Sequence, residues 1–238
     1  MTTFGLITEG ITDQFVIENI LIGYFDKDED NIEFNELQPL RDEVDENRAK
    51  NYGGWCKVLE YCESDEFKEA LRFHNYIIVQ IDTDVSDKPD GYGIPHYENG
   101  KELSPKQLIE KVMEKLTSLI GKSLYEKYQN KIIFAISVHS TECWLLPLYY
   151  TDNKKSKVTN CLRTLNQALQ KKENFTIDAK NPEYYENISK KYWKNKVLMK
   201  HYKENPSLKI FIEEIKKRNI VIDEDDLKGE PAGSPFKS

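Results

Sequence analysis

Asp82 and Asp84, two aspartates spaced two residues apart, are the side chains of this 238-residue sequence that most directly suggest chemistry. They follow the apolar run 76–81, which predicts a strand covered on both faces in a parallel sheet. On extended backbone the two carboxylates point the same way, and like charges so close resist burial unless a cation separates them. Mg²⁺, which prefers oxygen ligands, is the expected cation. The alternative interpretation is a solvated acidic turn.

Glu9 also stands where a predicted strand gives way to a helix. The short apolar run 4–8 predicts the strand, and Gly10 permits a sharp turn and a close approach of the backbone after it. Ligands of open parallel sheets bind beyond the carboxyl ends of the strands. We therefore expect Glu9 to meet Asp82 and Asp84 at one edge of the sheet, although a capping glutamate beside two turn aspartates is the simpler alternative.

Two more acidic residues are expected at the same edge. Asp13 lies four residues after Glu9, at the start of a helix for which Thr12 is the predicted N-cap. Glu142 follows the apolar run 132–138 and begins another helix. Both have a simpler interpretation, because the helix dipole favours carboxylates in the first turn of any helix. His139 lies beside them, but a lone histidine more often makes a structural hydrogen bond.

Apolar runs and helical patterns alternate along the first 150 residues. The helix after Ser104 has the clearest signals, because Ser104 and Gln107 form a capping box, Pro105 takes the first position and Gly121 ends the pattern. The alternation predicts an α/β fold with a mainly parallel sheet of about four strands flanked by helices. The predicted strands are residues 4–8, 32–37, 76–81 and 132–138.

The pattern becomes entirely helical after residue 150. We predict a catalytic domain over 1–150, a basic helical segment over 151–222 and a flexible tail over 223–238. A single basic and aromatic helix is expected over 185–202, with its tyrosines and tryptophan packed inside rather than stacked on bases. A further helix is expected after Asn205 and Pro206.

The net charge of −7 hides an uneven distribution, since residues 1–150 carry −13 and residues 151–218 carry +9. The overall negative charge argues against a general nucleic-acid binder, whereas the basic segment is suited to phosphates that an acidic metal site cuts. Lys190, Lys191 and Lys194 are the predicted nucleic-acid contacts. The alternative is that these lysines only cover solvated helix faces.

The cysteines and the hydropathy of the sequence indicate the cellular compartment of the protein. Cys56, Cys62, Cys143 and Cys161 form no CxxC pair and no pattern with the four histidines, so reduced thiols are expected and a zinc site is not. No apolar run approaches the roughly 20 residues that span a bilayer, and the N-terminus lacks a signal-peptide pattern. We expect a cytoplasmic protein without membrane contact, and the sequence leaves a homo-oligomer open.

Two motifs in this order resemble the TOPRIM domain, namely TEGITD at residues 8–13 and IDTDV at residues 81–85. That family, which includes topoisomerases, primases and OLD-type nucleases, places a glutamate after its first strand and Asp-x-Asp after a later one. An acidic residue four after the glutamate is similar to the OLD-like pattern. The segment SVHSTECWLLP at residues 137–147 is also similar to the OLD-like pattern, in which an acidic residue precedes an apolar helix that contains tryptophan. The resemblance covers roughly residues 1–150.

The resemblance implies an Mg²⁺-dependent nuclease that acts on DNA or RNA, with Mn²⁺ as a substitute cation. It implies Asp82 and Asp84 as metal ligands, Glu9 as a ligand or general acid–base group, and Asp13 and Glu142 as further ligands. Small proteins of this kind resemble effectors of antiphage defence systems, which work with a separate ATPase. The chain has no GxxxxGK[ST] loop, so such an ATPase would be a partner protein.

Two other functions remain open. The segment DTDVS loosely resembles the DxDx[TV] start of haloacid dehalogenase phosphatases, but that family carries it on an early strand, and Ser86 stands at the Thr/Val position. A non-catalytic interaction module built on the same fold is the other possibility. Release of phosphate from small phosphoesters would favour the phosphatase, and failure to bind Mg²⁺ would favour the module.

Overall fold

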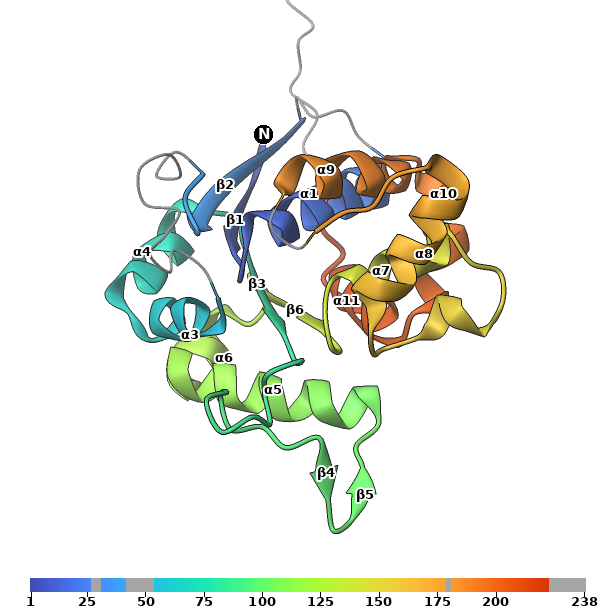
Figure 1. Cartoon of the computed structure of the whole chain (residues 1–238). Coiled ribbons are helices and arrows are strands. Elements are labelled where there is room, and N and C mark those ends of the chain that lie inside the picture. Colours follow the sequence, from blue (N-terminus) through green and yellow to red (C-terminus); the bar gives the residue numbers. More distant parts are fainter. Residues whose placement is uncertain (27–30, 42–53, 179–180, 223–238) are drawn as a thin grey trace, which may run out of the picture.

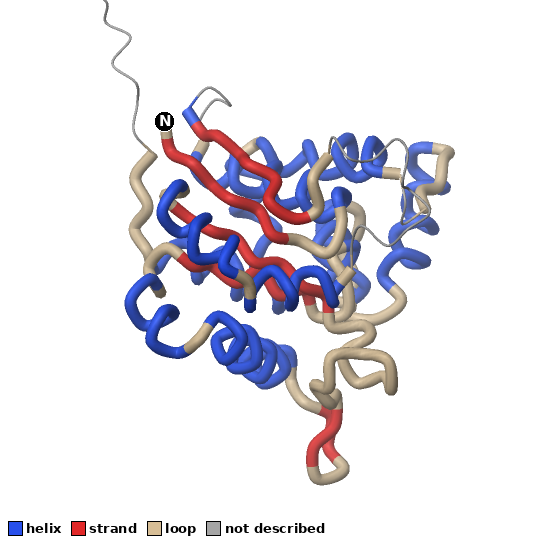
Figure 2. The backbone as a smooth tube through the Cα atoms, turned by 90° about the vertical axis from the view of Figure 1, so that its left-hand side faces the viewer, coloured by secondary structure: helices blue, strands red, loops and turns tan. Residues whose placement is uncertain are grey.

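The computed structural model describes residues 1–26, 31–41, 54–178 and 181–222. Its centre is a sheet with the strand order β2-β1-β3-β6, in which all neighbouring strands are parallel. Figures 1 and 2 show this sheet between layers of helices. The strands are β1 (Thr2–Ile7), β2 (Ile32–Gln38), β3 (Tyr76–Asp82) and β6 (Ile132–Ser137). The predicted α/β fold, with helices following the sheet toward the C-terminus, is confirmed.

The alternation of side chains along the strands divides the core into two parts. In β3, Ile78 packs into one hydrophobic cluster, whereas Ile77 and Val79 pack into the other. In β6, Ile133 joins the cluster of Ile78, and Phe134 joins the cluster of Val79. Both faces of the sheet are therefore apolar, as expected for a parallel sheet covered on both sides.

The face that carries Ile77 and Val79 is covered by helices from the first 130 residues. They are α3 (Trp55–Glu63), α4 (Asp65–Phe73), α5 (Pro105–Ile120) and α6 (Lys122–Tyr128). The predicted capping box of α5 is present, because the Ser104 side chain accepts from the Gln107 N–H and the Gln107 side chain accepts from the Ser104 N–H. The start of this helix is thus fixed locally, as the sequence predicted.

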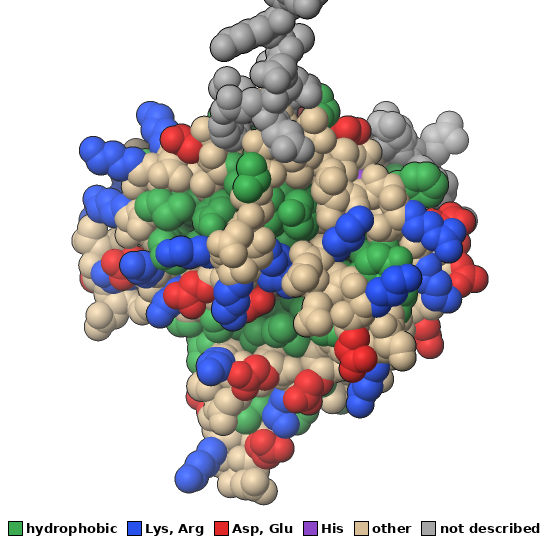
Figure 3. Space-filling view, turned by 180° about the vertical axis from the view of Figure 1, so that it is seen from behind, with side chains coloured by type: hydrophobic (Ala, Val, Ile, Leu, Met, Phe, Trp, Pro, Cys, Tyr) green, Lys and Arg blue, Asp and Glu red, His purple; other side chains and the backbone are tan. Residues whose placement is uncertain are grey.

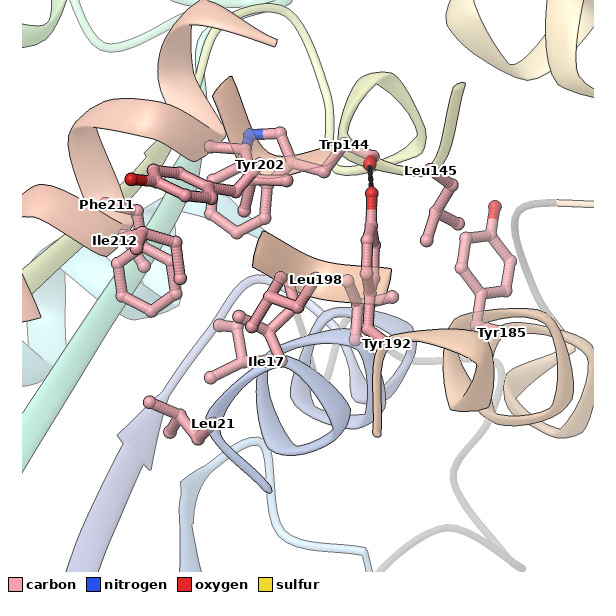
Figure 4. Close-up of a cluster of buried hydrophobic side chains, with 14 of the residues drawn as sticks. Ile17, Leu21, Trp144, Leu145, Tyr185, Tyr192, Leu198, Tyr202, Phe211 and Ile212 are labelled. Carbon is pink, nitrogen blue, oxygen red and sulfur yellow. Dashed lines mark hydrogen bonds between the residues drawn. The ribbon is translucent and has the colours of Figure 1, made fainter. Parts of the chain in front are cut away.

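The opposite face is covered by α1 (Ile11–Phe25) and by helices that follow β6. The later helices are α7 (Glu142–Leu145), α8 (Cys161–Glu173), α9 (Pro182–Ser189), α10 (Asn195–His201) and α11 (Pro206–Lys217). Figure 4 shows Ile17 and Leu21 of α1 beside Tyr192, Leu198 and Phe211 of the later segments. The two parts of the chain that the charge pattern separates therefore share one hydrophobic core.

Close packing joins α1 to the 3₁₀ turn η4 (Lys190–Trp193). A Cβ placed on Gly23 of α1 would lie only 1.8 Å from the carbonyl oxygen of Tyr192, so a side chain at this position would push the two elements apart. The Tyr192 hydroxyl donates a hydrogen bond of 2.5 Å to the carbonyl of Trp144 in α7 (Figure 4). The C-terminal helices are thus fitted against both α1 and α7.

Two predicted helix boundaries are wrong. Helix α1 begins at Ile11, so Gly10 is its N-cap, where Thr12 was expected. The continuous helix expected over 185–202 is instead α9, η4, α10 and the 3₁₀ turn η5 (Tyr202–Glu204). The bends let η4 and α10 follow the surface of α1, where the Asn195 side chain donates to the Gly23 carbonyl at 2.9 Å. Tertiary packing overrides helical propensity in this segment.

A small hairpin, absent from the sequence predictions, projects from the loop between β3 and α5 (Figures 1 and 2). It consists of β4 (Tyr97–Glu98) and β5 (Lys101–Glu102), which pair antiparallel. The connecting residues Asn99 and Gly100 both have positive φ, 50° and 74°. An Asn-Gly pair with positive φ at both positions is the signature of a two-residue hairpin turn, so the sequence contained the signal.

One cysteine prediction is wrong. The sulfur atoms of Cys143 and Cys161 are bonded, and the bond joins α7 to α8. Cys56 and Cys62 are free thiols. The spacing of the cysteines did not indicate the pair, because pairing depends on Cα atoms that the fold brings to 5.0 Å.

Two further expectations concern membrane-spanning helices and the tail predicted after residue 222. Within the described ranges, no helix combines the length and apolar character needed to cross a bilayer. The tail predicted over 223–238 lies outside the described residues.

Candidate functional site

The candidate site lies at the carboxyl edge of the sheet, where β1 and β3 end side by side. The Glu9 carboxylate accepts a hydrogen bond of 2.8 Å from the backbone N–H of Asp82. Gln80, fully buried within β3, accepts from the Glu9 N–H at 2.9 Å and donates to Asp82 Oδ1 at 2.8 Å. Glu9 and Asp82 therefore meet as the sequence predicted.

Asp13 reaches the same edge from the first turn of α1. Its side chain is buried, and the nearby Thr141 hydroxyl and Gly10 backbone lower its pKa against the effect of burial. A Cβ on Gly10 would lie 3.2 Å from Asp13 Oδ2, so the glycine allows the carboxylate to approach closely. The Gly10 backbone itself is extended (φ −148°, ψ 164°), which any residue adopts. The close approach expected at Gly10 is present. The sharp turn expected there is not, because the Gly10 backbone is extended.

Glu142 begins α7 just beyond β6 and completes the acidic group. The Tyr185 hydroxyl, contributed by α9, donates to Glu142 Oε1 at 2.5 Å. The neighbouring Thr141 hydroxyl donates to Asp82 Oδ1 at 3.3 Å and so connects the end of β6 to the end of β3. The helical segment after residue 150 thus supplies a polar group to the sheet edge.

Burial and repulsion by neighbouring carboxylates favour the neutral forms of Glu9, Asp13 and Asp82. Burial raises the pKa of Glu9 to about 8; the Asp82 N–H opposes the shift, and the charges of Asp13 and Asp84 add to it. The pKa of Asp13 is raised to about 7, mainly by burial and then by Glu142. Burial and all four neighbouring carboxylates hold the pKa of Asp82 well above its usual range. Five carboxylates therefore interact at one edge of the sheet.

The chemistry of this donor set fits a hard divalent cation. The described groups that act on Glu9, Asp13 and Asp82 are carboxylates and uncharged hydrogen-bond donors, without a basic side chain among them. In the described ranges no three Asp, Glu, His or Cys side chains already converge on one point where a metal ion fits. Glu9 Oε1 and Asp82 Oδ1 accept hydrogen bonds within the protein, which orients both carboxylates at the sheet edge.

The backbone beyond β3 is held firmly in place. The Tyr92 hydroxyl donates to the Asp82 carbonyl at 2.7 Å. The His139 carbonyl accepts from the N–H groups of both Thr83 and Asp84, at 3.1 and 3.0 Å. The His139 N–H in turn donates to Thr83 Oγ1 at 2.7 Å. These contacts fix the backbone that carries Asp82 and Asp84 against the end of β6.

The predicted nucleic-acid contacts lie on η4 and at the start of α10. Lys190 forms an ion pair of 2.5 Å with Glu186, and Lys191 forms one of 2.6 Å with Glu173. Lys194 is exposed just before α10. Figure 3 shows basic and acidic side chains interspersed across the face seen from behind. Two of the three lysines are therefore already engaged with acidic partners of the same chain.

Sequence reasoning missed three polar residues of the site. Gln80 was detectable, because it is the one polar residue within the apolar run 76–81 and is fully buried. Thr141 immediately precedes Glu142, but nothing marked its hydroxyl as a partner of Asp82. Tyr185 is 43 residues from Glu142, and no local pattern connects them.

No protein-family model, curated protein or solved structure matches this chain. The TOPRIM resemblance therefore rests on the motifs alone and stays a prediction. Function is inferred below from the carboxylates and their surroundings.

Proposed function

We propose that this chain hydrolyses phosphodiester bonds in nucleic acid with the help of a divalent cation held among five carboxylates. These are Glu9, Asp13, Asp82, Asp84 and Glu142. The observation that carries the proposal is their mutual repulsion at a buried sheet edge, where none of the described groups that act on Glu9, Asp13 and Asp82 is a basic side chain. Such an arrangement is unfavourable unless a ligand compensates it, and groups perturbed in this way cluster at functional sites.

Residues of the chain orient the carboxylates. A bound Mg²⁺ neutralises phosphate charge and activates water, which is the chemistry that hydrolysis of a phosphodiester needs. Gln80 and Thr141 hold Asp82 Oδ1 from two directions, at 2.8 and 3.3 Å. Tyr185 orients Glu142 through its hydroxyl. We assign Asp82 and Asp84 as ligands and Glu9 as a ligand or general acid–base group, as the resemblance implies.

The basic helical segment supports nucleic acid as the substrate. Residues 151–218 carry a net charge of +9, and their helices belong to the hydrophobic cluster on the face of the sheet that presents Asp82. Tyr185 of this segment reaches Glu142 itself. The net positive charge of this segment can attract a phosphate backbone that the carboxylates alone would repel.

Cleavage assays test the proposal. Plasmid, single-stranded DNA and tRNA are incubated with the protein and Mg²⁺ or Mn²⁺, beside Glu9→Ala and Asp82→Asn. Asp90→Asn is the matched control, because Asp90 is an exposed carboxylate of the following loop outside the acidic group. We expect cation-dependent cleavage that falls by about 100-fold or more in the first two variants and persists in the control. Equal cleavage by Asp82→Asn and the unmodified protein would contradict the proposal.

A partner ATPase and a role in antiphage defence belong to the same proposal and follow from the resemblance. If the purified chain binds Mg²⁺ but cuts nothing, addition of cell extract that contains the partner should restore cleavage in the unmodified protein and not in Glu9→Ala. A chain that neither binds Mg²⁺ nor cuts under either condition is an interaction module instead.

A further inference from the structure

A cavity lies beside the acidic edge, at the ends of β3 and β6 and against the start of α5. Its volume is about 430 Å³, which is in the range of sites for small molecules. Its lining includes Thr83, Gln107, Leu108, Val138, His139 and Thr159. The cavity thus combines apolar walls with a few polar groups, as ligand sites commonly do.

The cavity and the acidic edge share a wall. Thr83, which lines the cavity, stands between Asp82 and Asp84 in the chain. The charge of Asp84 acts directly on the His139 ring, which lines the cavity as well. The cavity is therefore adjacent to the carboxylates, so a substrate whose phosphate lies at the carboxylates has the cavity beside it.

His139 has an unsatisfied ring nitrogen. Its Nδ1 is buried and has no hydrogen-bond partner among the described residues. Its backbone is held in the left-handed region, with φ of 69°, which is unfavourable for a residue with a side chain. A buried polar atom without a partner is also unfavourable, and a ligand in the cavity can supply the missing hydrogen bond once the ring turns to present Nδ1 to the cavity.

The charges around the cavity select against an anion. Its described lining residues include Glu102 and His96 but no lysine or arginine, and the charges of Asp84 and Glu142 act on His139 against the opposing charge of Lys88. Gln107 Oε1 already accepts from Ser104, so its Nε2 is the group left to donate to a ligand. A neutral planar ring with hydrogen-bonding edges suits these walls, whereas a phosphate does not.

We propose that this cavity binds the base of the nucleotide whose phosphate lies at the acidic edge. The placement of the phosphate rests on the proposed function. Leu108 and Val138 would contact the faces of the base, and His139 Nδ1 and Gln107 Nε2 its edge. A base stacked in a duplex cannot enter such a cavity, so the substrate is a single strand or presents a flipped nucleotide.

Binding of nucleosides without any metal tests the cavity separately from cleavage, because a nucleoside has no phosphate for the carboxylates to repel. ¹⁵N-labelled protein in EDTA is titrated with each of four nucleosides and with ribose, up to about 10 mM, which detects millimolar Kd values. We expect at least one nucleoside to shift the amide signals of Gln107, Val138 and His139, and ribose to leave them unchanged. Absence of nucleoside shifts, or equal shifts with ribose, overturns the proposal.

Variants locate the binding. Thr159→Trp should fill the exposed rim of the cavity and weaken nucleoside binding at least about tenfold, whereas Asn153→Trp, an exposed neighbour outside the lining, should not. His139→Asn removes the ring and suits the left-handed backbone, and it should weaken binding as well. Equal affinity in all three variants places binding elsewhere and overturns the proposal.

A single-stranded oligonucleotide with fluorescent 2-aminopurine separates substrate bases from free nucleosides. We expect Thr159→Trp to reduce its fluorescence change and Asn153→Trp to preserve it. Nucleoside binding without any effect of Thr159→Trp on the oligonucleotide identifies a site for free nucleosides and overturns the substrate role. Cation-dependent cleavage without nucleoside binding contradicts only the cavity assignment, whereas nucleoside binding without cleavage, both with and without cell extract, contradicts the proposed function.

Discussion

The backbone N–H of Asp82 donates a 2.8 Å hydrogen bond to the carboxylate of Glu9, although 73 residues separate them. The pairing of β1 with β3 causes this contact, because Ile7 lies opposite Val79 in parallel register and both strands end at the same edge. Motifs far apart in the sequence thereby become neighbours. The other carboxylates join them from α1, from the loop after β3 and from α7.

Asp82→Asn should preserve or raise thermal stability in the absence of cations. The substitution removes one of several repelling charges but keeps Oδ1 as an acceptor for Gln80 and Thr141. We expect the Tm in EDTA to stay equal or to rise by about 2–4 °C for each kcal/mol gained. Asp90→Asn should leave the Tm unchanged. A clear drop in Tm for Asp82→Asn alone would mean that the carboxylate stabilises the fold.

Stability without metal should fall as the pH rises. Glu9 and Asp13 have pKa values of about 8 and about 7 when folded, above their usual 4.5 and 3.8. Between the usual and the raised values the folded protein keeps protons that the unfolded chain releases, so the free energy of unfolding decreases with pH. The contribution of these groups is fully present below about pH 4 and is lost by about pH 8.

Urea unfolding in EDTA at a series of pH values measures this slope. Glu9→Gln should flatten it, because the variant has no proton to lose at this position. Mg²⁺ should stabilise the unmodified protein more at pH 8 than at pH 5, since the cation competes with protons for the carboxylates. Identical slopes for Glu9→Gln and the unmodified protein would falsify the assignment of this pH dependence to Glu9.

The sheet edge was predictable from sequence because its signals are local. Apolar runs marked each strand; Glu9 and Asp82 directly follow two of them, and Glu142 lies a few residues beyond a third. The rule that parallel strands end together then brings these residues to one place without further information. Gly10 was interpreted less well, because its close contact with Asp13 depends on a carboxylate position that only the fold defines.

The C-terminal helices were less predictable because tertiary contacts shape them. The segment 185–202 has the composition of one helix, but packing around Gly23 breaks it into shorter pieces. The bond between Cys143 and Cys161 and the contact of Tyr185 with Glu142 both join elements that have no local relation. Long-range pairing of this kind leaves no periodic trace in the sequence.

Tyr185→Phe should weaken cation binding by about tenfold, because Tyr185 orients Glu142 through its hydroxyl. The loss of one hydrogen bond should lower the free energy of unfolding by about 1 kcal/mol. Tyr150→Phe is the matched control, since the Tyr150 hydroxyl donates to the Thr164 carbonyl at 2.8 Å outside the acidic group. The control should lose similar stability in urea and retain its affinity for Mn²⁺. Equal cation affinity in both variants would exclude the orienting role.

Reversal of Lys190, Lys191 and Lys194 to Glu should weaken binding of long nucleic acids and leave Mg²⁺ affinity intact. Binding should also weaken as salt increases, because phosphate contacts release counterions. Glu186 and Glu173 already neutralise the first two lysines, so Lys194→Gln alone should account for most of the change in the salt slope. Filter binding at several salt concentrations measures this. If the triple variant binds and cuts normally, the lysines are a solvated or docking surface.

Reduction of the Cys143–Cys161 bond should lower the free energy of unfolding. The bond closes a loop with a sequence separation of 18 residues, for which chain entropy predicts about 3 kcal/mol. Urea unfolding with and without reductant measures the loss. The double variant Cys143→Ala, Cys161→Ala should be equally unstable in both conditions. An unchanged unfolding midpoint on reduction would show that the bond is not present in solution.

Titration of Mg²⁺ and Mn²⁺ into the protein by calorimetry tests the acidic site most directly, because it requires neither a substrate nor a partner. Affinity should be lost in Asp82→Asn and preserved in Asp90→Asn, and the unmodified protein should release protons on binding at pH 7, where Glu9 is still largely protonated. Absence of binding by the unmodified protein, or equal binding by Asp82→Asn, would contradict a cation site at the meeting point of β1 and β3.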